Sequence, residues 1–171
     1  MPILPAQRDP RLITIRRGGS LTDAHHRLLA DWALRCAEHV LPLFEAHRPD
    51  DARPRHALEV GRAWVRGEAR MTEARLALPA HAVAHGLPDA PRLAVLAVGQ
   101  AAAVAHVAAH DLGAAAYAIR AAGAAAPPPD AARARAAERE WQRAQLPAEV
   151  RALVLDDQRR RSAICWHVFD D

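Results

Sequence analysis

Two histidine pairs have a spacing that suits metal chemistry. His81 and His85 are four residues apart, and so are His106 and His110. Residues at positions i and i+4 share one face of an α-helix, so each pair could offer two imidazoles to one ion. A bundle with one such pair on each of two helices could hold one metal ion. A metal-binding bundle or a metal-dependent enzyme is therefore one alternative function.

The remaining parts of a metal site or catalytic site are missing from the sequence. Zinc proteases place Glu directly after the first His, whereas Ala82 and Val107 stand there. Carboxylate di-iron bundles use Glu-x-x-His, and no histidine here has Glu at that spacing. Cys36 and Cys165 fit neither a metal nor a redox spacing. With ten histidines in the chain, we interpret both pairs as ordinary histidines and predict no catalytic residue and no cofactor.

A charged segment near the C-terminus holds the candidates for contact with a partner. Trp141 stands among arginines and glutamates, where a tryptophan either pins its helix to the bundle or presents an aromatic ring to another molecule. Both interpretations stay open. With the neighbouring Arg139 and Arg143, it forms the predicted interaction set.

The basic residues give little support to nucleic-acid binding. The net charge is +3, and all 23 basic residues are arginines, which indicates codon bias more than a basic recognition surface. An Arg-rich nucleic-acid-binding module, using Arg133–Arg143 and Arg159–Arg161, is kept only as a further alternative.

The stretch 92–123 must organise the fold, because it is almost wholly Ala, Val, Leu and Gly. It is either one long central helix or a buried hairpin. On one regular helix, a single polar arc would contain Arg92, Gln100, His106, His110 and Asp111. We expect this arc to form hydrogen bonds within the bundle, with Asp111 as a local cap or a buried hydrogen-bond partner.

The whole sequence predicts an all-α single domain of about six to seven helices around that central element. Hydrophobic residues make up 51% and aromatic residues 4%, and Ala, Leu and Arg are strong helix formers. Residues 1–19 form a short extended N-terminal arm, and residues 20–171 form the helical domain. The expected helices are near 21–46 with a kink before Pro42, 54–66, 72–86 with a bend at Pro79, 91–122, 130–146 and 147–161.

The sequence predicts no membrane span and a cytoplasmic location. Charged residues follow Met1 closely, unlike a signal peptide, and polar residues interrupt the Ala-rich stretch. A homo-oligomer stays open, because nothing in the sequence decides the oligomeric state.

Several segments in their order resemble a known family. These segments are Asp31–Glu45, Arg48–Arg55, Ala63–Glu68, Gly99–Ala101 and Ala105–Ala118. They are similar to bacterial immunity proteins of the immunity-5-like helical family, over roughly residues 20–160. The resemblance implies an all-helical domain that binds and neutralises a cognate toxin without catalysis, so the partner is a protein. It brings no catalytic residues.

Overall fold

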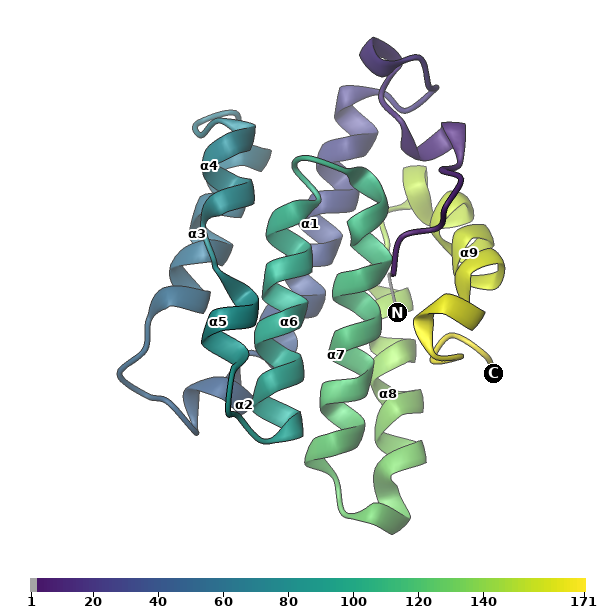
Figure 1. Cartoon of the computed structure of the whole chain (residues 1–171). Helices are drawn as coiled ribbons and strands as arrows, with labels where there is room; N and C mark the ends of the chain where they lie inside the picture. The colour runs from purple at the N-terminus through teal and green to yellow at the C-terminus, as the bar shows by residue number, and fades with distance from the viewer. Residues whose placement is uncertain (1–2) are drawn as a thin grey trace.

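Two Ala-rich helices, α6 (Asp89–Ala103) and α7 (Asp111–Ala125), run antiparallel at the centre of the molecule (Figure 1). The computed structural model describes residues 3–171. Of the two arrangements that the stretch 92–123 allowed, the hairpin is the one formed. A continuous helix of this length would extend about 48 Å. Folding back instead lets the two small-residue faces bury each other, and α7 is almost wholly buried.

The predicted polar arc assumed one regular helix, and this assumption is wrong. The chain leaves the helix after Ala103, becomes extended at Val107, and makes the short 3-10 helix η3 (Ala108–His110) before α7. No glycine or proline marks this turn. Side chains from distant segments donate instead to its carbonyls: His26 Nε2 to Val104 O at 2.6 Å, and Arg161 Nη1 to Ala109 O at 2.8 Å.

The other helices surround this hairpin. α1 contacts both of its helices, α8 packs on α7, and α3, α4 and α5 cover the outer side of α6 (Figure 1). The bounds are α1 Asp23–Val40, α2 Pro42–Glu45, α3 Arg53–Val65, α4 Met71–Leu76, α5 Ala80–Ala84, α8 Ala131–Ala144 and α9 Ala148–Arg161. Seven of the α-helices in the described part have six or more residues. The predicted all-α single-domain class is confirmed.

Proline divides two of the expected helices. α1 ends at Val40 and α2 begins at Pro42, which has no N–H to continue the hydrogen-bond ladder. The predicted range 72–86 is likewise split around Pro79 into α4 and α5. Trp32 is fully buried in α1, and its Nε1–H donates to the carbonyl of Gln142 at 2.8 Å. This bond ties α1 to α8.

The N-terminal arm is more folded than an extended segment. It contains two 3-10 helices, Pro10–Leu12 and Ile15–Arg17, and Thr14 pairs with Leu21 in an isolated bridge. Gly18 has φ +87°, which lets the chain reverse direction there. Leu12 is buried, so the arm is anchored on the bundle. Residues 1–2 of the predicted arm lie outside the described residues.

Candidate interaction site

The helical geometry assumed for the two histidine pairs is not formed. α5 has only five residues, so His81 lies in it while His85 lies just beyond its end with extended backbone. His106 lies in the turn after α6, and His110 ends η3. Within residues 3–171, no group of three or more His, Cys, Asp and Glu side chains is arranged to share a metal ion.

One residue of the predicted polar arc holds the hairpin in register. His110 Nδ1 lies 2.7 Å from Gln100 Oε1, which joins the last residue of the turn region to α6. Burial, the largest cause, and the positive charges of nearby basic residues together lower the pKa of His110 to about 4. The expectation of hydrogen bonding within the bundle is confirmed for this pair.

Trp141 pins α8 to α1. Its ring stacks on the imidazole of His39, with centroids 3.6 Å apart and planes 8° from parallel. His39 Nδ1 in turn lies 2.7 Å from Oε2 of the buried Glu138. Trp141 also borders an open hollow of about 610 Å³, together with Glu38, Arg62 and other polar residues. Of the two interpretations of Trp141, the structure shows the pinning contact.

Arg139 and Arg143 contact the C-terminal tail of their own chain. Arg143 donates from Nη2 to the carbonyl of Phe169 at 2.9 Å and from Nη1 to Asp171 Oδ1 at 2.7 Å. Arg139 donates to the backbone carbonyl of Asp170. The two guanidinium groups thus hold the tail, whose apolar residues Val168 and Phe169 are buried against the bundle.

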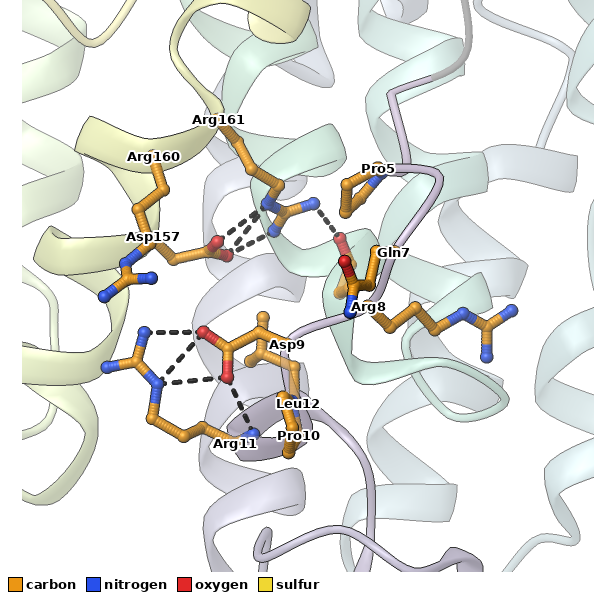
Figure 2. A pocket seen from close by; sticks show the side chains of 11 residues that line it. Pro5, Gln7, Arg8, Asp9, Pro10, Arg11, Leu12, Asp157, Arg160 and Arg161 are labelled. Atoms are coloured by element: carbon orange, nitrogen blue, oxygen red, sulfur yellow. Dashed lines mark hydrogen bonds and ion pairs between the residues drawn. The ribbon is translucent and has the colours of Figure 1, made fainter.

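The arm creates a site that the sequence analysis missed. Two cavities of about 420 Å³ each lie beside the arm, and Arg8 and Leu12 line both of them. We call the surface around these cavities the arm face. The first cavity lies between the arm and the end of α9, and Figure 2 shows its polar lining. Its lining residues are Pro5, Gln7, Arg8, Asp9, Pro10, Arg11, Leu12, Ala109, Asp157, Arg160 and Arg161.

A buried ion-pair cluster forms one wall of the first cavity. Arg161 is 4% exposed, and its Nη2 lies 2.5 Å from Asp157 Oδ2 and 3.3 Å from Asp111 Oδ1 (Figure 2 draws the Asp157 pair). Asp111 is fully buried and also accepts a hydrogen bond from the Leu112 N–H at 2.6 Å. Burial, the largest cause, and repulsion from Asp157 raise the pKa of Asp111 to about 7, although the positive charge of Arg161 opposes this rise. The expected buried role of Asp111 is confirmed.

The second cavity is rimmed by positive charge. It lies between the arm and the α6–α7 turn, and among the described residues that line it none is acidic. Arg8, Arg16 and Arg17 supply its cationic groups. The other lining residues are Leu12, Ile13, Thr14, His26, Trp64, Met71, Ala105, His106, Val107 and Ala108.

The rim arginines are exposed and only partly engaged within the chain. Arg16 pairs with Asp23 at 3.1 Å, although both side chains remain largely exposed. Arg17 Nη1 makes a long contact of 3.5 Å to the His106 carbonyl. Arg8 forms no ion pair within residues 3–171. These guanidinium groups are therefore available to anionic groups from outside.

Burial and the positive charge around the second cavity lower the pKa values of the two histidines that line it. Desolvation lowers the pKa of His106, and repulsion from Arg75, Arg17 and Arg8 adds to the effect. The pKa of His26 is also lowered, mainly by burial, with Arg17 among the smaller contributions. Both imidazoles therefore favour the neutral form, which leaves the arginines as the charged groups of the cavity.

The sequence held a weak signal for this site. Arg16-Arg17 is a basic pair in a segment with turn residues, yet the cavity depends on a contact between Arg17 and a turn 89 residues away. Such long-range contacts have no local pattern that could reveal them.

The chain matches the profile of a known family. The profile of the family described as "Imm-5 like putative immunity protein" matches residues 19–149, which is more than half of the chain. No curated protein and no solved structure gives a significant match. Among the helices of residues 3–171, none combines the length and the apolar character needed to cross a membrane.

Proposed function

We propose that this chain, which belongs to the Imm-5 like immunity protein family, binds a cognate bacterial toxin. In this proposal it neutralises the toxin by covering a functional surface of the toxin. Family membership carries this proposal. The arm face supports it, because it offers exposed charged groups beside hollows of the size that binding pockets have. In this proposal the protein acts as a stoichiometric inhibitor and not as an enzyme.

The proposed place of action is the cytoplasm. Cys36 and Cys165 are both free thiols and both buried, as expected for a protein that folds in a reducing compartment. Burial raises the pKa of Cys165 to about 11, so this thiol stays protonated at neutral pH and is a poor nucleophile.

Co-expression with candidate toxins chosen from the neighbouring genes tests the proposal. We expect the protein to restore growth and to co-purify with the toxin in a fixed ratio. Titration of its expression level separates occlusion from catalysis, because an occluding protein protects only when it is at least as abundant as the toxin. Protection by far fewer copies than the toxin would refute occlusion. Failure both to protect and to co-purify would refute the immunity function.

A further inference from the structure

We propose that the second cavity of the arm face is the docking site for an acidic segment of the toxin that carries an apolar side chain. This inference rests on the proposed function and adds to it the surface used and the chemistry of the partner. It is built on the charge of the rim, on the apolar lining within it, and on an exposed isoleucine beside it.

The rim selects an anionic partner. Arg8, Arg16 and Arg17 are all exposed, and the described residues that line the cavity include no carboxylate to neutralise them. Asp23 pairs with Arg16 but does not line the cavity. Guanidinium groups bind carboxylates through two parallel N–H donors, so three of them in one rim can orient an acidic segment.

The lining within the rim selects an apolar side chain. Leu12, Trp64, Met71 and Val107 contribute apolar surface to the cavity. Its volume of about 420 Å³ suits one or two side chains and not a whole helix. Ile15 lies on the arm between the rim residues and is 60% exposed, although large apolar side chains are otherwise mostly buried here. An exposed isoleucine beside a partly apolar hollow is typical of a contact surface.

A polypeptide fits these features better than a nucleic acid does. Nucleic-acid surfaces present many cationic groups in a long track and aromatic rings for base stacking. Here three arginines surround one compact hollow, and the indole of Trp64 packs edge-on against His26, with centroids 5.1 Å apart. The face therefore matches one short acidic and apolar segment.

The decisive variant reverses the rim charge with Arg8→Glu, Arg16→Glu and Arg17→Glu together. The matched control reverses three exposed arginines in the α2–α3 loop and at the start of α8, far from the arm (Figure 1). These are Arg48, Arg133 and Arg135, each changed to Glu. A second control keeps the rim charge by changing the three rim arginines to lysine. Circular dichroism and thermal melting establish that every variant is folded before its binding is measured.

Two assays use these proteins. The first is protection from the toxin in co-expression. The second is fluorescence anisotropy at low salt with a short labelled peptide in which Glu and Asp flank a central Leu. We expect the rim reversal to abolish protection and to weaken peptide binding about tenfold or more, because attraction becomes repulsion at three places. The control with reversed charge far from the arm should behave like the original protein, and the lysine control should bind more tightly than the rim reversal, because it keeps the charge although it lacks the paired N–H donors. Replacing the acids of the peptide by Gln and Asn should have the same effect as the rim reversal.

The outcomes distinguish failure of this inference from failure of the immunity function. If the original protein and the rim reversal protect equally well, the docking site is refuted while the immunity function stands. If the original protein does not protect, the immunity function fails, and the peptide assay then decides the docking site alone. Absence of peptide binding in that case overturns it. Tighter binding of a single-stranded DNA oligonucleotide than of the peptide, lost in the rim reversal, also overturns it.

Discussion

Replacing Arg161 by Met should destabilise this protein more than any other single arginine substitution on α9. The side chain is 4% exposed and its guanidinium contacts Asp157, Asp111 and the carbonyl of Ala109. Met has a similar length and no charge, so it preserves most of the apolar packing. It leaves two buried carboxylates without their cation and one turn carbonyl without a donor.

The expected cost follows from these contacts. Removing one partner of a buried ion pair typically costs about 3–5 kcal/mol, because the remaining charge stays desolvated. In a domain of this size, each kcal/mol lowers the melting temperature by about 2–4 °C, so the variant should melt roughly 6–20 °C lower. Arg160→Met is the matched control. Arg160 is the preceding residue and its side chain is 62% exposed, so losing its pair with Asp156 should cost at most about 1 kcal/mol.

Thermal melting and urea denaturation, both followed by circular dichroism, measure both variants, and the pH dependence of the urea result tests the cause. In Arg161→Met, Asp111 loses the guanidinium that opposes the rise of its pKa, so its folded pKa should lie above the value of about 7 in the original protein. The folded variant then keeps a proton to higher pH than the folded original protein, so the loss should shrink as pH falls from alkaline values toward 6. Equal melting temperatures for Arg161→Met and Arg160→Met would refute the argument. A loss that stays constant with pH would refute its electrostatic part.

Three further predictions concern the hairpin and the tail. The pKa of His110 is about 4 in the folded state and has an ordinary value of 6.5, so the unfolded state binds the proton first as pH falls. Between pH 6.5 and 4, the original protein should therefore lose up to about 3 kcal/mol of its free energy of unfolding relative to His110→Asn, as measured by urea titration. Gly99→Ala would place a Cβ 2.4 Å from the Cβ of Ala80, which forces α5 from α6 and should cost about 1–3 kcal/mol by chemical denaturation. Arg143→Ala should cost about 1–3 kcal/mol and speed carboxypeptidase digestion of the tail, whereas the exposed Arg133→Ala should do neither.

The sequence predicted the parts of the fold that local chemistry decides. Pro42 and Pro79 divide helices where a missing N–H requires it. The small apolar residues of the stretch 92–123 had to be central, as the buried Ala97 and Ala115 show. Each of these predictions needed only nearby residues.

The end of α6 could not be predicted in the same way. Residues 104–107 read Val-Ala-His-Val, which has neither a glycine nor a proline to stop a helix. For the same reason, the spacing of the histidines predicted that each pair lies on one regular helix. The metal-site hypothesis relied on that prediction, which is wrong. The helix ends there because donors from α1 and α9 bind the turn carbonyls, and a donor 78 or 52 residues away leaves no local signal.

The same donors explain why the hairpin turn and the arm face belong together. His26 and Arg161 bind carbonyls of the turn, and each also lines a cavity of the arm face. Arg17, on the rim of the second cavity, reaches the carbonyl of His106 in the same turn. The backbone of the turn is therefore fixed by groups that also border the proposed contact surface. The family match begins at residue 19 and ends at residue 149, so Arg17 and Arg161 lie outside it. In our proposal, the contact surface therefore has two parts. The α6–α7 turn lies within the region that matches the family, and the segments that hold Arg17 and Arg161 lie outside that region.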